Sequence, residues 1–230
     1  DKLGNPQVTI DNILVIGPGS NDNYGAQGIA LGGSNADISY NSFSRNYNSG
    51  SPDYGVDGAA IEVFGSKNAT IHHNKSMNDL IFSELGNGAT GTIVHHNVVY
   101  SSLGAAGGIN IHGAGAYGRV TGTKVVNNSM VLTAKDSVVF VADGGAGCEL
   151  KNNVLSAAIS YTENPIDEAG NVWAISGWQG VNSTNAANSK GVAKTSTTTG
   201  AAGLVSPATG DFRLTPKSAA INRAVPTSVA

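Results

Sequence analysis

The stretch from Ala60 to Asn97 contains nearly the same pattern twice. Each half has a short apolar run, AIEVFG and then IFSELG, followed by a polar turn and a second short run, ATIHHN and then TIVHHN. The two closing asparagines, Asn74 and Asn97, are 23 residues apart. A βαβ unit needs about 30 or more residues, so neither half has room for a helix. A short repeat of strands and turns predicts a solenoid.

Asparagines close similar segments along much of the chain, at positions 41, 74, 97, 128 and 153. Their spacing varies because strands keep their length while loops carry insertions, as solenoids allow. We expect short strands in each coil, with successive coils about 4.8 Å apart. Asparagine tolerates the left-handed backbone conformation and bonds well in turns. We therefore predict a buried asparagine ladder at one turn, formed by Asn74, Asn97 and Asn128.

The composition suits a β protein with many turns. Charged residues make up 13% of the chain, against about 25% in typical domains, and 31 residues are glycine. The 13 Lys and Arg residues are not clustered, which argues against a nucleic-acid partner. Cys148 is the single cysteine, so no internal disulfide can form. The sequence contains no transmembrane run, and we expect no membrane insertion. Together with the abrupt start, DKLGNPQ, this profile predicts a secreted or cell-surface protein, trimmed from something longer.

The repeat fades after residue 160. We expect parallel β-helix coils in residues 1–160, and the last strands with an irregular C-terminal capping segment in 161–230, all in a single domain. The segment GDFRLTPKSAAINRA is predicted to fold back over the last coil. Such a cap would hide an open strand edge that otherwise invites aggregation. The sequence does not indicate an oligomeric state.

Four motifs, GVDGAAIEVFG, NDLIFSELGNG, ENPIDEAGNVW and GDFRLTPKSAAIN, carry a family resemblance. They resemble bacterial exported right-handed parallel β-helix proteins with pectin-lyase-like repeats. The resemblance implies an all-β fold, a right-handed parallel β-helix solenoid. It also implies an extended polysaccharide as partner, since members are mostly polysaccharide lyases, glycoside hydrolases or uronan epimerases. Many other members have no assigned reaction. The motifs are specific for the fold and weakly specific for activity.

Alternation along the first strand of each coil predicts which side chains face outward. The inward positions are Ile29, Leu31, Ile61, Val63, Ser83, Leu85, Ile109, Ile111, Val139 and Val141. One outward column then contains Ala30, Glu62, Glu84, Asn110 and Phe140, and the columns beside it contain Phe64, His112 and Phe82. The position of Glu84 depends on a one-residue choice of register, because a slip would turn it inward.

This outward patch is the densest group of chemically active side chains in the sequence. We predict Glu62, Glu84 and His112 as catalytic residues. We predict substrate contacts from Asn110, Phe64, Phe82 and, in the 42–58 insertion, Tyr54. Two close carboxylates suit glycoside hydrolysis, with one as acid and the other as base or nucleophile. In a lyase they would instead hold Ca²⁺ against a uronate, with His112 as base.

Other readings of the same residues remain open. The patch fits a solvated sheet face equally well, and the chain could be a non-catalytic carbohydrate-binding or adhesive module of a larger surface protein. A structural spike or an ice-binding solenoid is a third reading, although the regular Thr-x-Thr array that ice binding needs is absent.

Metal binding is not predicted from the histidines. We expect His72 to stack over His95 and His73 over His96, with each neighbouring pair pointing to opposite faces. No cysteine or nearby carboxylate completes a tetrahedral site. Four loop acids could offer oxygen ligands to Ca²⁺, the one cofactor considered, but their spacing is that of solvated acids rather than of a calcium loop. These acids are Asp53, Asp57, Asp79 and Asp143.

Overall fold

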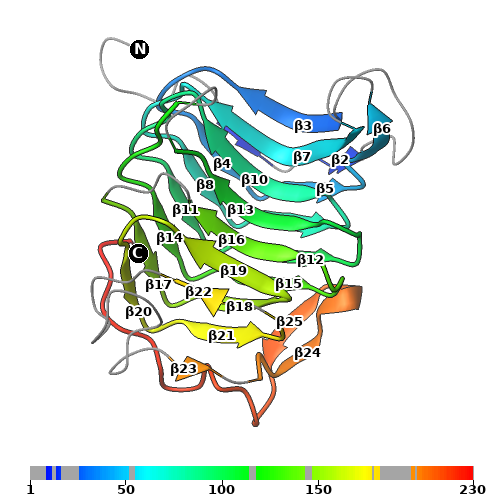
Figure 1. Cartoon of the computed structure of the whole chain (residues 1–230), viewed down its shortest axis with the longest axis vertical. Helices are drawn as coiled ribbons and strands as arrows, with labels where there is room; N and C mark the ends of the chain where they lie inside the picture. The colour runs from blue at the N-terminus through cyan, green and yellow to red at the C-terminus, as the bar shows by residue number, and fades with distance from the viewer. Residues whose placement is uncertain are drawn as a thin grey trace.

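The chain is an all-β parallel solenoid (Figure 1). The structure is a computed structural model that describes residues 9–11, 14–16, 26–51, 55–113, 118–142, 147–177, 179–181, 198–199 and 201–229. Within these ranges the only helix is a short 3₁₀ turn, η1 (Pro207–Thr209). No helix in the described part has the length and apolar composition needed to cross a bilayer. The predicted fold class is confirmed.

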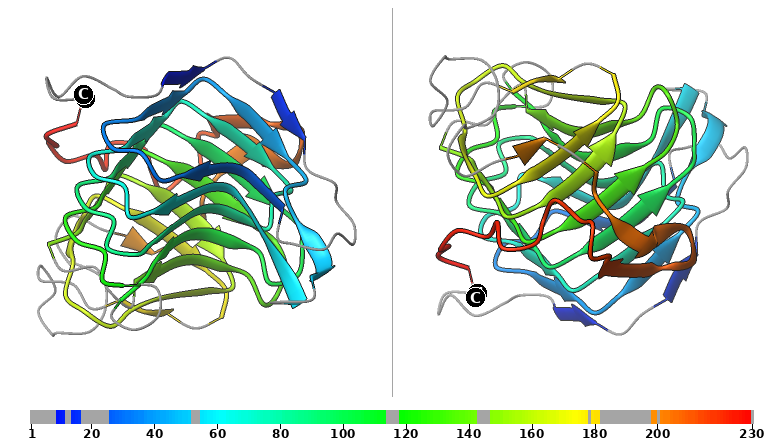
Figure 2. Two further views of the ribbon diagram at one scale, coloured as in Figure 1. Left: turned by 90° about the horizontal axis from the view of Figure 1, so that it is seen from above. Right: turned by 90° about the horizontal axis from the view of Figure 1, so that it is seen from below.

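Successive coils add strands to three parallel sheets, and Figure 2 looks along the resulting stack. Sheet A contains β1 (Thr9–Asp11), β4 (Asp37–Ser39), β8 (Thr70–His72), β11 (Ile93–His95), β14 (Lys124–Val126), β17 (Glu149–Lys151) and β20 (Asp167–Ala169). Sheet B contains β2 (Leu14–Ile16), β5 (Ser42–Ser44), β9 (Lys75–Met77), β12 (Val98–Ser101), β15 (Ser129–Leu132), β18 (Val154–Ala157), β21 (Val172–Ile175) and β23 (Thr198–Thr199). Sheet C contains β3 (Ala26–Leu31), β7 (Gly55–Phe64), β10 (Ile81–Gly86), β13 (Gly107–Ile111), β16 (Val138–Ala142), β19 (Ile159–Thr162) and β22 (Gln179–Gly180), with β6 (Asn48–Ser51) paired antiparallel to β7.

The core lies inside the coils and consists of stacked aliphatic columns. In sheet A, for example, the central residue of each strand is buried and lies in register with those above and below: Ile38, Ile71, Val94, Val125 and Leu150. Burying one such side chain contributes about 1.5–3 kcal/mol. At the next position this column ends in Glu168, a buried carboxylate that accepts hydrogen bonds from Asn171 Nδ2 at 2.9 Å and Trp173 Nε1 at 3.1 Å.

The asparagine ladder forms at the turn between sheets A and B. Asn97 Oδ1 accepts hydrogen bonds from Asn74 N and Nδ2 at 2.9 and 3.1 Å. Asn128 accepts the corresponding bonds from Asn97 at 3.0 and 2.9 Å. The ladder extends beyond the predicted members to Asn41, Asn153 and Asn171, all of them buried. The prediction of a buried ladder is confirmed.

The left-handed residue of this turn is the one before each ladder asparagine. These residues are Tyr40, His73, His96, Asn127 and Asn152, with φ between 53° and 58°, and Gly170 with φ 68°. The ladder asparagines themselves were expected to supply this conformation, and that expectation is wrong. The left-handed position turns the chain from sheet A to sheet B, so the asparagine side chain that follows is directed into the stack.

A second buried polar contact joins the first two described turns between sheets B and C. Asp79 Oδ1 accepts from Asn46 N at 2.8 Å and Asn46 Nδ2 at 2.7 Å, while its Oδ2 accepts from Ser76 Oγ at 2.6 Å. Asp79 was grouped with solvated loop acids that could bind Ca²⁺. It is 2% exposed, and burial raises the pKa of its carboxyl group. That prediction is wrong because the carboxylate is a structural acceptor inside the fold.

The C-terminal residues pack along the side of the solenoid. A hairpin of β24 (Leu204–Ser206) and β25 (Asp211–Leu214) leads into a tail that exchanges two 2.8 Å hydrogen bonds between Val225 and Asn152. Ser228 Oγ accepts a bond from Lys124 Nζ at 2.7 Å. Figure 2 (right) shows the hairpin in orange and the tail in red along one side of the stack. The hydrogen bonds described for this C-terminal segment therefore join it to the side of the solenoid.

Candidate functional site

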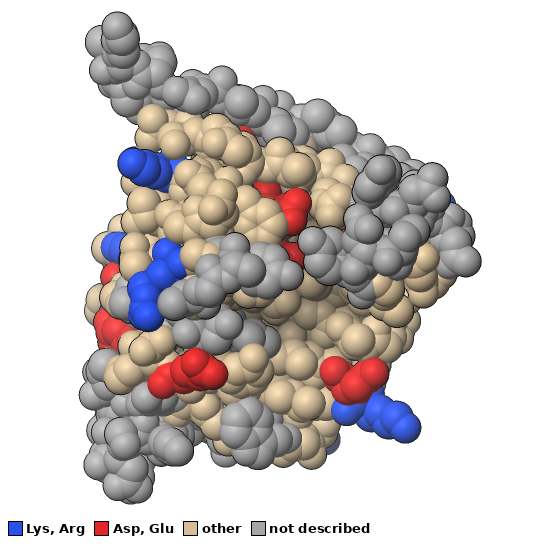
Figure 3. All heavy atoms as spheres, turned by 45° about the horizontal axis from the view of Figure 1, so that its top comes forward, with Lys and Arg blue, Asp and Glu red and all other residues tan. Residues whose placement is uncertain are grey.

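Three neighbouring strands of sheet C bring together the predicted outward column. Glu62 in β7 lies in register with Glu84 in β10, and Glu84 lies in register with Asn110 in β13. All three side chains are partly exposed, whereas the flanking positions Ile61 and Leu85 are fully buried. The register chosen from alternation is therefore the one observed, and the two glutamates lie one coil apart on the same face. Figure 3 shows acidic side chains on a surface that is largely uncharged.

His112, which follows β13, contacts Glu84 directly. Its Nε2 atom lies 2.7 Å from Glu84 Oε1, and its backbone N–H donates to Leu85 O at 3.0 Å. The side chains of His112 and Glu84 are only 20% and 18% exposed. A hydrogen bond from Nε2–H to a carboxylate in so sheltered a place is strong when the imidazole is protonated. The contact fixes the orientation of both groups.

Phe64 lies beside this pair because position 86 has no side chain. Gly86 is in register with Phe64, and a Cβ atom at Gly86 would overlap the phenyl ring. The centre of that ring is 6.5 Å from the centre of the His112 ring. Gly86 was not singled out from the sequence, although a glycine next to an outward aromatic residue in the adjacent coil is a signal that coil alignment could detect.

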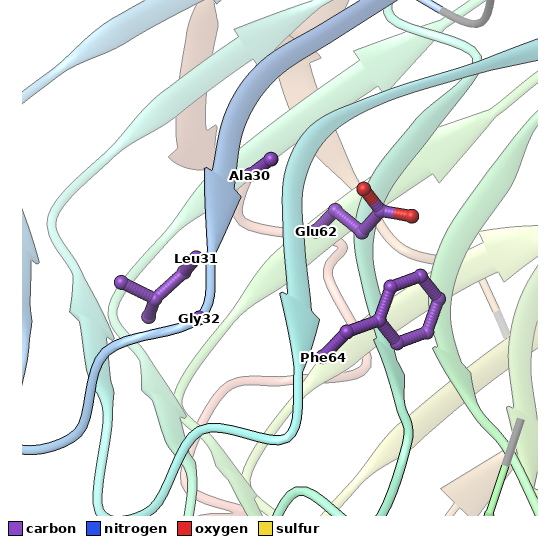
Figure 4. Close-up of a pocket in the computed structure, with 5 residues that line it drawn as sticks. All are labelled: Ala30, Leu31, Gly32, Glu62 and Phe64. Carbon is purple, nitrogen blue, oxygen red and sulfur yellow. The ribbon is translucent and has the colours of Figure 1, made fainter.

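A shallow hollow adjoins the column on the side of β3. Its volume is about 210 Å³, and its lining residues, shown in Figure 4, are Ala30, Leu31, Gly32, Glu62 and Phe64. In Figure 4 the side chains of Glu62 and Phe64 leave β7 on the same side. The small residues of the neighbouring coil leave the space that these two side chains border.

Glu62 has an unusual titration in this setting. Burial raises the pKa of Glu62, and the nearby negative charges of Glu84 and Asp57 raise it further. Close carboxylates cannot both ionise easily, so Glu62 remains protonated to a higher pH than an isolated glutamate. The column itself contains no Lys or Arg that could oppose this effect among its described members. Asp57 belongs to this site electrostatically, a role that the sequence did not indicate.

Asn110 adds an acceptor to the column. Its Oδ1 atom is buried and, among the described residues, has no hydrogen-bond partner. A buried polar atom without a partner costs about 1–3 kcal/mol, so a donor that reached it would be bound favourably.

Phe82 is not part of the surface, and its predicted role in stacking against a substrate is wrong. It is 1% exposed and belongs to the hydrophobic core. It lies opposite Ala60 and Gly108, and a Cβ at Gly108 would be 3.2 Å from the core sulfur of Met130. At this point two successive positions of each strand are buried, so simple alternation fails.

Phe140 is also inward, contrary to prediction. It is 1% exposed and in register with Ile109, and Val141 is the residue in register with Asn110. In the fifth coil Val139 is buried as predicted, and Phe140 and Ala142 are buried with it. The strand reads VVFVA, and a continuous apolar run carries no alternation to mark its faces. Tyr54, the remaining predicted contact residue, lies outside the described residues, as do Asp53 and Asp143.

The four adjacent histidines form a second cluster, at the turn between sheets A and B. His72 stacks on His95 with ring centres 4.8 Å apart, and His73 stacks on His96 at 5.1 Å, as predicted. The Nδ1 atoms of His72 and His73 are only 2.8 Å apart, so the expectation that they point to opposite faces is wrong. The left-handed backbone of His73 breaks the strand alternation. In the described part of the chain, no three metal-ligating side chains are arranged to hold a metal ion.

Comparisons with protein-family models, with curated proteins and with solved structures gave no match. The parallel solenoid therefore rests on the strand registers described above. The narrower resemblance to pectin-lyase-like proteins remains a prediction from the sequence motifs.

Proposed function

We propose that the outward face of sheet C binds an extended polysaccharide and hydrolyses its glycosidic bonds. One observation carries the proposal: Glu62, whose pKa is raised, lies in register with Glu84, which is held by His112. Glycosidases need two carboxyl groups in different protonation states, and different surroundings produce that difference.

The roles follow from the surroundings of each group. Glu62 is the general acid, since a carboxyl with a raised pKa still carries a proton to give to the leaving oxygen. Glu84 is the nucleophile or base, and the 2.7 Å contact with His112 Nε2 fixes its orientation. Adjacent parallel strands lie about 4.8 Å apart, and a separation of about 5–5.5 Å between carboxyl groups is typical of retaining enzymes.

The surface around the two acids suits a sugar chain. Phe64 offers an aromatic surface at the edge of the hollow beside β3. Asn110 and His112 continue the row of polar groups across the next coil. Binding sites commonly combine such apolar surfaces with a few polar groups that fix orientation. A substrate of this kind is consistent with a secreted or cell-surface location.

A lyase acting on uronates is less well supported. The described column contains two carboxylates and no Lys or Arg, so an anionic polymer would be repelled unless a cation intervened. The base of a lyase would have to be His112, whose Nε2 is already engaged by Glu84.

Binding without catalysis is the second candidate. It is favoured by the hollow itself, which is shallow and borders only one of the two acids, Glu62. In that case Glu62 and Glu84 would accept hydrogen bonds from sugar hydroxyls.

A polysaccharide panel, uncharged and uronate-containing, tests the proposal. New reducing ends and the ultraviolet absorbance of unsaturated products should be followed together. We expect reducing ends without unsaturated product on an uncharged polymer, and about a 10²-fold or greater loss of rate in Glu62→Gln and in Glu84→Gln. Asp136→Asn, at an exposed turn between β15 and β16, is the matched control and should keep full activity.

Unsaturated product would assign a lyase instead. Retained binding with no product would assign a binding module. Unchanged binding and turnover in both glutamate variants would show that the column is only a solvated face.

A further inference from the structure

The histidine quartet, His72, His73, His95 and His96, is a compact group of four imidazoles outside the sheet C site. Each coil contributes a strand histidine and a turn histidine whose Nδ1 atoms meet at 2.8 Å: His72 with His73, and His95 with His96. The two coils stack face to face, with ring planes 9° and 6° from parallel. Tyr40 extends the stack, with its ring 5.0 Å from that of His73.

The hydrogen-bond partners assign the protons on these rings. His72 Nε2 lies 3.4 Å from Asp37 Oδ2 and 3.2 Å from Oδ1, so Nε2 carries the proton and Nδ1 is the acceptor. The Nδ1–H of His73 must then donate to His72. In the next coil Asn127 Nδ2 donates to His96 Nε2 at 3.2 Å, so His96 likewise carries its proton on Nδ1 and donates to His95.

One proton between the two Nδ1 atoms of each coil satisfies this arrangement. A second proton on the same pair of histidines disrupts it. A proton added to Nδ1 of His72 or His95 would face the Nδ1–H of its neighbour at 2.8 Å. A proton added to His96 Nε2 would face the Asn127 amide. Any second charge would also lie about 5 Å from a charged ring in the stacked coil, where like charges repel.

The charged groups around the quartet do not offset this repulsion. Asp37 of β4 contacts His72, and its charge raises the pKa of His95 by less than burial and the other histidines lower it. Two lysines occur farther along sheet A and are bound to acids: Lys124 to Glu149 at 3.3 Å, and Lys151 to Glu149 and Asp167 at 3.2 and 2.5 Å. From the next coil the neighbours are Val126 and Asn127, which do not titrate.

We infer that the histidine quartet makes this corner of the solenoid acid-sensitive. The turn from sheet A to sheet B stays closed while the imidazoles are neutral, and it opens locally when both rings of a coil are protonated. Burial and the neighbouring histidines lower the pKa of His95 to about 4 and lower that of His73, which agrees with a closed state that resists protonation. Histidine is the side chain suited to such a response between about pH 5 and 8.

Amide hydrogen exchange on the intact chain tests this inference. The backbone N–H groups of His73 and His96 donate to His95 O at 3.3 Å and Val126 O at 3.2 Å, so they report closure of the turn. Between about pH 7.5 and pH 5, we expect their protection factors to fall about tenfold or more. Ile109 and Ile111 in sheet C should remain better protected than these two amides at every pH, because their exchange requires the whole fold to open.

The chain supplies its own matched variant. Asn127 and Asn152 occupy the same left-handed position in later coils with φ 58°, so His73→Asn with His96→Asn keeps the turn conformation and removes two imidazoles. In this double variant the acid-induced loss should be less than about twofold, whereas His112→Asn should respond like the parent. If the double variant does not fold, His96→Asn alone should abolish the response at position 96 and keep it at position 73.

Three results would overturn the inference. The first is an equal loss of protection in the double variant. The second is no loss at His73 and His96 in the parent. The third is protection at His73 and His96 that equals that of Ile109 and Ile111 at every pH, which would mean that the turn opens only when the whole fold unfolds.

Discussion

Glu84 and His112 are 28 residues apart in sequence, and their side chains meet at 2.7 Å because they lie in adjacent coils. Stacking converts a long sequence separation into one strand spacing, about 4.8 Å. The charges of the site therefore lie close together, and removing one of them should change the pH dependence of activity measurably.

Asp57→Asn should move the alkaline limit of activity to lower pH. Glu62 acts in its protonated form, so activity is lost as pH rises through the raised pKa of Glu62. Removing the negative charge of Asp57 lowers that pKa, and the asparagine can still accept the hydrogen bond from Gly58 N–H. The pH dependence of kcat/KM on the best polysaccharide measures the shift. A profile that matches that of Asp136→Asn would contradict it.

Gly86→Ala should displace Phe64 without unfolding the protein. The new methyl group overlaps the phenyl ring, but this ring is partly exposed and can rotate toward solvent. We expect a change in unfolding free energy of less than about 1 kcal/mol. Polysaccharide affinity should fall as far as in Phe64→Ala, measured by calorimetry. Tight binding by Gly86→Ala together with weak binding by Phe64→Ala would show that the ring has another productive position.

Asn97→Leu should destabilise the fold by about 3 kcal/mol or more. The substitution leaves Asn74 N and Ile71 O without their partner inside the stack, and it removes one of the two donors to Asn128 Oδ1. Asn127→Gly is the matched control: it removes a neighbouring amide but keeps a residue that accepts the left-handed backbone, so we expect less than about 1 kcal/mol. Denaturant unfolding of both variants checks the difference, and equal midpoints would contradict the ladder's role.

Global stability should fall in acid through His95. The pKa of His95 is about 4 in the fold, against 6.5 when unfolded, so the unfolded chain binds more protons between these values. The contribution of neutral His95 is complete above pH 6.5 and is lost as pH falls toward 4, by at most about 3 kcal/mol. Chemical unfolding at several pH values measures this slope. His95→Gln should flatten it, and an unchanged slope would assign the effect elsewhere.

Periodicity in the sequence was sufficient to predict the coils, the ladder and the column of Glu62, Glu84 and Asn110. It was insufficient where apolar and polar residues do not alternate along a strand. Phe140 belongs to a wholly apolar strand, and the burial of Phe82 reflects a local loss of alternation. Neither can be read from residue type, because both depend on how neighbouring coils pack.

Two other features, the left-handed turn position and the buried Asn46–Asp79 contact, could be predicted from a closer alignment of the coils. His73 and His96 align with Asn127, Asn152 and Gly170, residue types that favour the left-handed conformation. Asn46 and Asp79 are separated by 33 residues, the same interval that separates Asn41 from Asn74. Coil-equivalent polar residues at a turn predict a buried contact even where one of them is an acid.

The asparagine ladder has a direction. Every rung donates its backbone and side-chain N–H groups to the asparagine of the following coil, from Asn41 through to Asn171. On a ribosome, the newest coil therefore emerges with its donors facing a coil that has not yet been synthesised. Chains grow and fold from the N-terminus, so each coil is completed by its successor. A nascent chain that stalls after Asn97 should fray at that coil and remain ordered at Asn41 and Asn74.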